Sequence, residues 1–443
     1  MRTLIKNATI VNEGTEYCAS VLIDNDLIAK VFTEDAPKNI MADSIIDATG
    51  LLLMPGVIDD HVHMRDPGLT HKADMQSETR AAAAGGVTSV MDMPNVMPQT
   101  TTIELWQQKM QHAAETSRVN YAVYLGATND NLDEIRKIDP TRIPALKLFM
   151  GSSTGGMLVD QEEPLCKIFS ECPTLIMTHC EDTQRINARM AEAKKQHGDD
   201  PSIEWHAWIR DEEACYLSSA LAVGMAQKTG ARLHLAHITT AKELSLLSSE
   251  ALGNKNITAE VCPQHLYYTD NDYKRLGSLI KCNPSIKSDA DRQALRQALN
   301  NGLVDVIGTD HAPHLLSEKQ GGAAKAVSGM PMMQFSLPLM LTMSDEGILP
   351  RTRLVELMCH NPALLFHIEK RGFIREGYKA DLVLLKKQDW KVGEACILSK
   401  CGWSPLTGET LSWKVASTWC NGQQVYDGDT MNDNVRGEAL RFC

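Results

Sequence analysis

Residues 59–68 read DDHVHMRDPG, and they continue the apolar run MPGVI at positions 54–58. A short apolar run bounded by Pro and Gly predicts a buried strand. Residues two apart in a strand point to the same side, so this pattern places His61 and His63 in one pocket. Neutral imidazole is a good ligand for zinc-like cations. The pair alone is equally compatible with two hydrogen-bonded core histidines, so its meaning depends on what other segments add.

The middle of the chain repeats this kind of segment. Runs this apolar are typical of parallel strands buried on both faces. Stretches with helical patterning, such as 103–118 and 212–230, suit the crossover helices between them. This alternation predicts an α/β protein with a (β/α)8 TIM barrel. A doubly wound open sheet is the alternative, but the glycine-rich phosphate loop typical of its first strand is not found. The eight runs are GVIDDHVH, GVTSVMDMPN, NYAVYLGAT, PALKLFMG, TLIMTHCED, RLHLAHIT, ITAEVCPQHL and LVDVIGTDHAPH.

Both ends of the chain have a different pattern. The first part contains short alternating segments such as TLIKNATIV and SVLIDNDLIAKV, which turn at Gly and Asn. The last part resumes this style in RGFIREGYKADLVLLK and LSWKVASTWCNGQQVYDG. We therefore predict a small β-sandwich domain formed from residues 1–54 and 368–443, flanking a barrel over residues 55–367.

Composition limits the classes of partner. The chain has 443 residues and a net charge of −12, and an acidic surface disfavours nucleic acid. The N-terminus lacks the apolar core of a signal peptide, and no uninterrupted apolar stretch has the length of a membrane span. The 12 cysteines include no CxxC pair and are expected to be reduced. These features predict a cytoplasmic protein.

Most of the apolar runs end in polar residues. His179 ends the fifth run, His237 the sixth and Asp310 the eighth. In a barrel, the C-terminal strand ends form the active-site face, so these side chains are predicted to meet His61 and His63 there. His234 lies on the opposite pleat from His237 and is interpreted as structural. His265 and His311 lie nearer the predicted site, but a structural role is the stronger expectation for each.

Lys147 is unusual because it lies inside the buried run PALKLFM. An unpaired ammonium there is costly, so the amine must be neutralised, paired or modified. One interpretation is a salt bridge to a barrel carboxylate. The other is carboxylation by carbon dioxide to a carbamate whose two oxygens bridge two cations. We favour the carbamate for two reasons. Four neutral imidazoles and one aspartate leave most of the positive charge of two divalent ions uncompensated, and no other strand end supplies an anionic bridge.

The motifs resemble those of the amidohydrolase superfamily and, within it, the dihydroorotases. The pieces PGVIDDHVHMRDPG, GGVTSVMDMPN, ALKLFMG, THCED, HLAHIT, KCNPSIK and TDHAPH occur in order over about residues 55 to 330. The resemblance implies two metal ions, for which zinc fits the donors. It implies that His61, His63 and Asp310 bind one ion and that His179 and His237 bind the other. A carboxylated Lys147 and a hydroxide would bridge them, Asp310 would also carry the catalytic proton, and a homodimer is implied.

Substrate-facing residues separate the dihydroorotases from related enzymes, because dihydroorotate carries a carboxylate on its ring. Arg65 follows His63 at i+2, so it is expected on the same strand face as the two histidines, and a guanidinium binds a carboxylate with two hydrogen bonds. A surface arginine, or one paired with Asp66, is the alternative. Similar enzymes that act on uncharged rings usually lack this arginine. The resemblance implies further substrate contacts at Asn95, Asn283, His314 and Gly329.

Two departures from the family pattern leave details open. Lys287 ends a motif that often ends in arginine, and the segment VSGMPMMQF lacks the acidic residue that usually follows. The run MGSSTGGM at 150–157 is predicted to be either a loop that closes over substrate or a plain turn.

The expected activity is reversible cyclisation of N-carbamoyl-L-aspartate to L-dihydroorotate in de novo pyrimidine biosynthesis. Alternatives are a hydantoinase, dihydropyrimidinase or allantoinase. A non-catalytic scaffold with the same fold and a single-metal deaminase are further alternatives.

Overall fold

The structure is a computed structural model that describes residues 1–34, 40–151 and 157–443. All eight predicted runs form strands, and the third gives two short strands separated only by Tyr124. The loop predicted at 150–157 falls largely on residues 152–156, which lie outside the described residues. The barrel strands are β6 (Val57–Val62), β7 (Val87–Asp92), β8 (Asn120–Val123), β9 (Leu125–Gly126), β10 (Ala145–Phe149), β11 (Leu175–His179), β12 (Leu233–Leu235), β13 (Ile257–Val261) and β14 (Val306–Ile307).

These strands form a closed parallel barrel, which confirms the predicted (β/α)8 fold. One hydrogen-bonded set runs β6-β7-β8 and the other runs β9-β10-β11-β12-β13-β14. Tyr124 connects the two sets, and a parallel bridge between Val62 and His311 closes the ring. Because both faces of every strand are covered, almost every strand residue is buried, which explains the apolar runs in the sequence.

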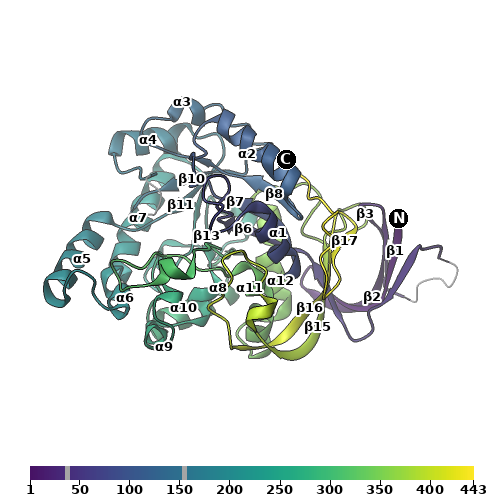
Figure 1. Cartoon of the computed structure of the whole chain (residues 1–443). Coiled ribbons are helices and arrows are strands. Elements are labelled where there is room, and N and C mark those ends of the chain that lie inside the picture. The colour runs from purple at the N-terminus through teal and green to yellow at the C-terminus, as the bar shows by residue number, and fades with distance from the viewer. Residues whose placement is uncertain (35–39, 152–156) are drawn as a thin grey trace.

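Helices surround the barrel (Figure 1). Their starts follow from side-chain caps: Asp211, for example, accepts a hydrogen bond from the backbone N–H of Ala214 at the start of α7. The two helices predicted at 103–118 and 212–230 are confirmed as α2 and α7. The helices are α1 (Met75–Ala84), α2 (Ile103–Thr116), α3 (Leu132–Ile135), α4 (Glu162–Glu171), α5 (Thr183–His197), α6 (His206–Ile209), α7 (Glu212–Thr229), α8 (Pro263–Tyr267), α9 (Tyr273–Leu276), α10 (Asp289–Asn300), α11 (Met333–Asp345), α12 (Arg351–Val355) and α13 (Asn361–Leu365).

The chain ends form the predicted small β domain beside the barrel (Figure 1). It differs from the predicted sandwich in one respect: hydrogen bonds join all of its strands into one eight-stranded sheet. The order is β17-β16-β15-β5-β1-β2-β3, and β4 also pairs with β1. The sheet is continuous because β5 pairs with β1 on one side and with β15 on the other. Its strands are β1 (Arg2–Asn12), β2 (Thr15–Asp24), β3 (Leu27–Phe32), β4 (Ser44–Asp47), β5 (Leu52–Pro55), β15 (Leu382–Lys391), β16 (Thr410–Cys420) and β17 (Gln423–Tyr426).

Strands from both chain ends share one apolar core. Ile10, Val21, Leu53, Leu384 and Trp419 belong to the same buried cluster. The chain passes from the small sheet to the barrel between β5 and β6, close to the boundary predicted at 54/55. We keep the boundaries at 54/55 and 367/368 as a prediction.

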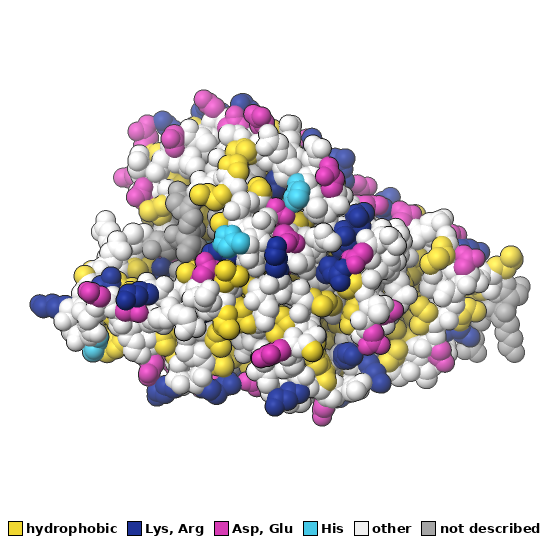
Figure 2. Space-filling view, viewed as in Figure 1, with side chains coloured by type: hydrophobic (Ala, Val, Ile, Leu, Met, Phe, Trp, Pro, Cys, Tyr) yellow, Lys and Arg dark blue, Asp and Glu magenta, His cyan; other side chains and the backbone are white. Residues whose placement is uncertain are grey.

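The last residues of the chain return to the barrel. Ala439 forms a parallel bridge to Tyr121 in β8, and Leu440 donates its N–H to the Tyr121 carbonyl at 2.9 Å. Acidic and basic side chains are interspersed over the visible face of the molecule (Figure 2). Within the described residues, no helix is both long enough and apolar enough to cross a membrane.

Candidate metal centre and active site

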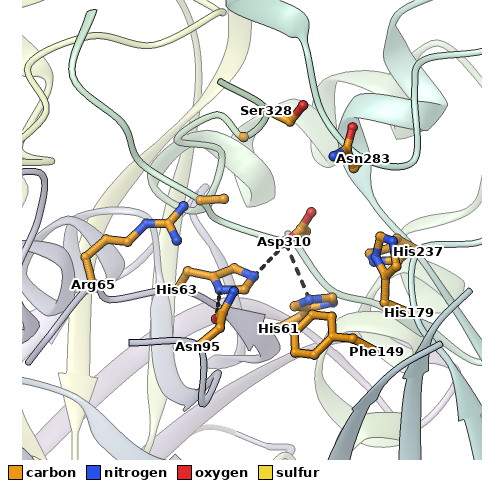
Figure 3. A pocket seen from close by; sticks show the side chains of 12 residues that line it. His61, His63, Arg65, Asn95, Phe149, His179, His237, Asn283, Asp310 and Ser328 are labelled. Atoms are coloured by element: carbon orange, nitrogen blue, oxygen red, sulfur yellow. Dashed lines mark hydrogen bonds and ion pairs between the residues drawn. The ribbon is translucent and has the colours of Figure 1, made fainter. Parts of the chain in front are cut away.

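A polar pocket lies at the C-terminal ends of the barrel strands (Figure 3). All of the predicted site residues line it except Lys147 and His314, which lie directly beside residues that do. The strand ends therefore meet as predicted. The lining residues are His61, His63, Arg65, Asn95, Phe149, His179, His237, Asn283, Asp310, Ala312, Ser328 and Gly329.

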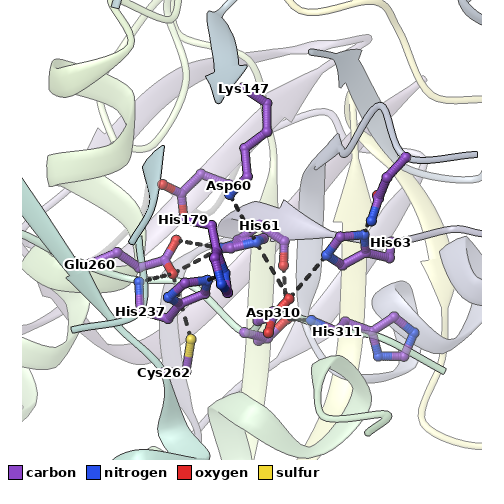
Figure 4. A network of polar contacts seen from close by, with 12 residues as sticks. Asp60, His61, His63, Lys147, His179, His237, Glu260, Cys262, Asp310 and His311 are labelled. Carbon is purple, nitrogen blue, oxygen red and sulfur yellow. Dashed lines mark hydrogen bonds and ion pairs between the residues drawn. The ribbon is translucent and has the colours of Figure 1, made fainter. Parts of the chain in front are cut away.

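Three acceptor atoms converge on one point in this pocket. The Nδ1 atom of His61 binds Glu260 at 2.9 Å, and the Nδ1 atom of His63 binds the amide oxygen of Asn95 at 2.7 Å. A carboxylate and an amide oxygen only accept, so each Nδ1 carries the proton. Both Nε2 lone pairs then face Oδ1 of Asp310, at 3.4 Å and 3.0 Å (Figure 4). These three ligand atoms lie within 4.8 Å of one another. The residues therefore fit a divalent cation.

Burial keeps the His63 ring neutral, since it lowers the pKa of His63 to about 4. With the proton on Nδ1, a neutral ring next to a carboxylate leaves two acceptors facing each other at 3.0 Å, and a cation between them would make this contact favourable. The structure thus supports the predicted grouping of His61, His63 and Asp310.

His179 and His237 form a second candidate position for a metal ion. Nε2 of His179 binds Glu181 at 3.0 Å, and Arg210 binds the same carboxylate oxygen. The Nδ1 lone pair of His179 is therefore directed at Nε2 of His237, 3.0 Å away. Burial lowers the pKa of both imidazoles, so both are neutral ligands. A carboxylate behind a histidine in this way fixes which nitrogen faces a metal.

Lys147 lies beneath the pocket on β10. Its side chain is fully buried, with Nζ 3.5 Å from Nε2 of His61 and 5.3 Å from the ring centre of Phe149. Within the described part of the chain, Lys147 forms no ion pair, so the salt-bridge interpretation is not supported. Burial lowers the pKa of its amine, which favours the neutral form that reacts with carbon dioxide. The carbamate itself stays a prediction.

The expectation about an anionic bridge concerned strand ends, and the structure adds two carboxylates that lie inside strands. Asp60 and Glu260 are buried under the site, and with His234 they form a second group with metal-ligand spacing. Glu260 is occupied by His61, while Nδ1 of His234 binds the Thr258 hydroxyl at 2.8 Å. His234 is therefore directed away from the pocket, as predicted from its pleat.

The backbone conformation that places Arg65 in the pocket differs from the one predicted from the sequence. We expected this residue on the continuing strand, but β6 ends at residue 62 and Arg65 has a left-handed φ of 64°. Its Nε donates to the Pro313 carbonyl at 3.0 Å, and its Nη2 contacts Nε2 of His314 at 2.9 Å. The pair with Asp66 is not formed, because Asp66 binds His112 at 2.8 Å instead.

The other predicted substrate contacts border the same space. Oδ1 of Asn283 is buried without a hydrogen-bond partner in the described structure. Gly329 has a φ of 128°, and a Cβ there would lie 2.7 Å from the Ala312 carbonyl oxygen. Only glycine lets this backbone pass so close to the pocket.

Three residues discussed from the sequence have structural contacts. His265 binds the Pro284 carbonyl at 3.1 Å, and His311 binds Glu78 at 2.8 Å. Lys287 donates to the hydroxyl and the carbonyl of the residue two positions before it, at 2.8 Å and 3.1 Å. None of the three lines the described pocket.

A model of the amidohydrolase family matches residues 52–425. The chain belongs to the amidohydrolase family. It is 32% identical to a dihydroorotase of Methanosarcina acetivorans, over 98% of this chain and 94% of that protein. It is 35% identical to a dihydroorotase of Halobacterium salinarum, over 86% and 87% of the two chains. An L-hydantoinase of Paenarthrobacter aurescens is 30% identical over 99% of this chain and 97% of its own.

A solved structure agrees with this assignment. The L-hydantoinase (dihydropyrimidinase) from Arthrobacter aurescens superposes with a TM-score of 0.92 at 29% identity, covering 97% of each chain. This amidohydrolase therefore has the fold of its family, and its barrel buries residues that could hold a metal ion.

Sequence reasoning missed several residues of the amidohydrolase site. Phe149 lies two positions after Lys147, Ala312 lies two positions after Asp310, and Ser328 directly precedes Gly329. Their closeness in sequence to predicted site residues was the only signal that could have identified them. The supporting carboxylates were also missed. Glu181 lies two positions after His179 in THCED, whereas Glu260 gave no such indication, because its partner His61 is far away in the chain.

Proposed function

We propose that this amidohydrolase is a dihydroorotase that interconverts N-carbamoyl-L-aspartate and L-dihydroorotate in pyrimidine synthesis. One observation carries the proposal. Arg65 is only 5% exposed, lines the pocket and forms no ion pair with any described residue. Burial lowers the pKa of Arg65 to about 10, so the guanidinium still keeps its charge at neutral pH. A buried cation is costly without an anion, and a ring carboxylate supplies one.

The metal ligands on this proposal are His61, His63 and Asp310 for one zinc ion, and His179 and His237 for a second. A carboxylated Lys147 would supply an anionic ligand to both ions. When bound, such ions supply an acidified water molecule and polarise the amide carbonyl.

The side chains of the pocket then bind and orient the substrate. Arg65 and His314 hold the ring carboxylate, and the free amide N–H of Asn95 adds a third donor. Oδ1 of Asn283 accepts from a ring N–H, and Gly329 offers backbone groups. Fixed orientation of this kind contributes several kcal/mol to lowering a barrier.

Asp310 carries the proton between the attacking water and the ring nitrogen. Burial opposes its ionisation, but His61 and His63 outweigh burial and lower the pKa of Asp310. It is therefore ionised and able to accept a proton during ring opening. In ring closure the Asp310 carboxylate takes the proton from the attacking ureido nitrogen and passes it to the leaving oxygen, which departs as water. We also propose a homodimer in the cytoplasm.

A hydantoinase is the second candidate, because the L-hydantoinase from Paenarthrobacter aurescens is about as similar as the dihydroorotases. Hydantoin has no ring carboxylate to pair with Arg65, which favours the first proposal. A non-catalytic scaffold is disfavoured because every predicted ligand position is filled.

The deciding experiment compares substrates on zinc-loaded protein of measured metal content. Ring opening of L-dihydroorotate, hydantoin, dihydrouracil and allantoin is assayed in parallel, together with cyclisation of N-carbamoyl-L-aspartate. We expect kcat/KM to be highest for L-dihydroorotate and its open form. Faster turnover of an uncharged ring would overturn the dihydroorotase proposal, and no turnover of any substrate would favour the scaffold.

A further inference from the structure

The ring of His314 is flanked by a cation at each nitrogen, and Oε2 of Glu318 also lies 3.6 Å from its Nδ1, beyond hydrogen-bonding distance. Nη2 of Arg65 lies 2.9 Å from its Nε2, and Nζ of Lys72 lies 3.2 Å from its Nδ1. Burial, reinforced by these two charges, lowers the pKa of His314, so the ring is neutral. A neutral imidazole has one N–H and one lone pair, whereas both cations only donate. In one of the two contacts, the N–H of the His314 ring therefore faces an N–H of a cation, so two donors oppose each other.

Lys72 is the cation that stays in place. Its Nζ forms a 2.6 Å ion pair with Oε1 of Glu318, whose Oε2 accepts the Leu315 N–H at 2.9 Å. Its own backbone N–H binds the Leu69 carbonyl at 3.0 Å. Both its charge and its chain segment are thus anchored.

Arg65 is the cation that is able to change partner. Within the described residues its contacts are the Pro313 carbonyl and the His314 ring, and no carboxylate pairs with it. Arg65 lines the pocket (Figure 3). An anion that enters the pocket would therefore take the hydrogen bonds of Arg65. The Nε2 atom of His314 next to it must then donate to the same anion, which requires the lone pair to be on Nδ1.

We propose that Lys72 holds the lone pair of His314 on Nδ1 and so presents the Nε2 proton to the substrate carboxylate beside Arg65. This inference rests on the proposed dihydroorotase function and makes Lys72 a specificity-determining positioning residue. The Nε2–H of His314 and the guanidinium of Arg65 are two hydrogen-bond donors that face each other. A carboxylate accepts from both donors, whereas an uncharged ring substituent does not. Lys72 thereby favours charged substrates without touching them.

The kinetic test compares Lys72→Met with Lys72→Arg, which retains a donor, in zinc-loaded full-length protein. Lys30→Met, an exposed lysine of β3 paired with Glu376, is the matched control. For Lys72→Met we expect KM for L-dihydroorotate to rise about tenfold or more, the loss typical of a hydrogen bond to a charged group. We expect kcat to change much less, Lys72→Arg to stay within about threefold, and the control to match wild type.

A spectroscopic test reads the proton position directly. Nitrogen-15 NMR of histidine-labelled protein, with the His314 signals assigned from a His314→Asn variant, distinguishes protonated from unprotonated ring nitrogens. With saturating L-dihydroorotate, we expect wild type to carry the proton on Nε2 and Lys72→Met to show a mixture. A Lys72→Met protein with unchanged KM and an unchanged His314 spectrum would overturn the role of Lys72.

A failure of the proposed dihydroorotase function would give a different result from a failure of the role of Lys72. If wild type neither binds nor converts L-dihydroorotate, the dihydroorotase proposal fails before any variant is made. If Lys72→Met does not fold, as judged by its thermal melt, Glu318→Gln releases the anchor of Lys72 instead. That variant should raise KM in the same direction by a smaller factor, and an unchanged KM would count against the inference.

Discussion

At the scale of single residues, the site is defined by which nitrogen of each histidine carries its proton. Glu260, Asn95 and Glu181 each bind the far nitrogen of one imidazole, so the near nitrogens face other acceptors. These supporting residues are as much a part of the site as the ligands they orient.

Replacing Arg65 with Met should reduce kcat/KM for L-dihydroorotate by about 100-fold or more, since truncating one member of a buried charged contact costs about 2–5 kcal/mol. Zinc content should stay unchanged, because Arg65 contacts no proposed ligand. Steady-state kinetics and metal analysis on the same preparation measure both quantities. Arg136→Met, which removes an exposed arginine, is the control. Wild-type turnover by the Arg65 variant would remove the case for a carboxylate-bearing substrate.

Replacing Glu260 with Gln should weaken zinc binding by about 10- to 100-fold, because the Nδ1 proton of His61 loses its carboxylate partner. Competition with a zinc chelator gives the affinity. Glu163→Gln, an exposed glutamate of α4, should bind zinc like wild type. Equal affinities for the two variants would show that Glu260 does not support the centre.

The ligands themselves were predictable from the sequence, and their supports were not. His63, His179 and Asp310 each lie at the end of an apolar run, and the ends of parallel strands meet at one face of a barrel. Glu260 lies in a run whose pairing with His61 exists only after the barrel closes. The approach of Arg65 also could not be predicted, because a left-handed backbone leaves no pattern in side-chain polarity.

At the scale of elements, the barrel strands are short and the loops beyond them place the chemistry. β14 covers only residues 306–307, and Asp310 follows it with a φ of 46°. His237 likewise lies beyond β12, with a φ of 40°. Apolar patterning identified the strands correctly, whereas it could not show where each strand stops. The single sheet of the small domain was also missed, because the pairing of β5 with β15 is long-range.

Replacing Gly329 with Ala should lower kcat/KM by more than about tenfold and destabilise the fold by about 1–3 kcal/mol. A Cβ at this position would lie 2.7 Å from the Ala312 carbonyl and 2.9 Å from a ring carbon of His314. Kinetics and urea denaturation measure the two effects. Gly224→Ala in α7 meets nothing within 4 Å and should instead stabilise by about 0.5–1 kcal/mol. A fully active Gly329→Ala protein would contradict the close approach.

At the scale of the whole molecule, acid should destabilise this protein through its buried histidines. Burial lowers the pKa of His63, His234 and His265 from 6.5 to about 4. Between these values the unfolded chain binds protons that the native state does not. The free energy of unfolding should therefore fall as the pH drops from about 6.5 to about 4.

Urea denaturation of metal-free protein at several pH values in this window measures the slope. His265→Gln, which lies outside the ligand set, should reduce the slope, whereas the exposed His71→Gln should preserve it. An identical slope for both variants would show that buried His265 does not contribute to acid sensitivity.

The sheet that joins the two chain ends also constrains how the protein is made. Leu53 of β5 pairs with Leu384 of β15, so the first strands leave the ribosome long before their partner exists. Until then β5 presents an open hydrogen-bonding edge, the kind of edge on which nascent chains aggregate. Prematurely terminated translation products that lack β15 should therefore be prone to aggregate. A chaperone that shields β5 during synthesis would raise the yield of native enzyme.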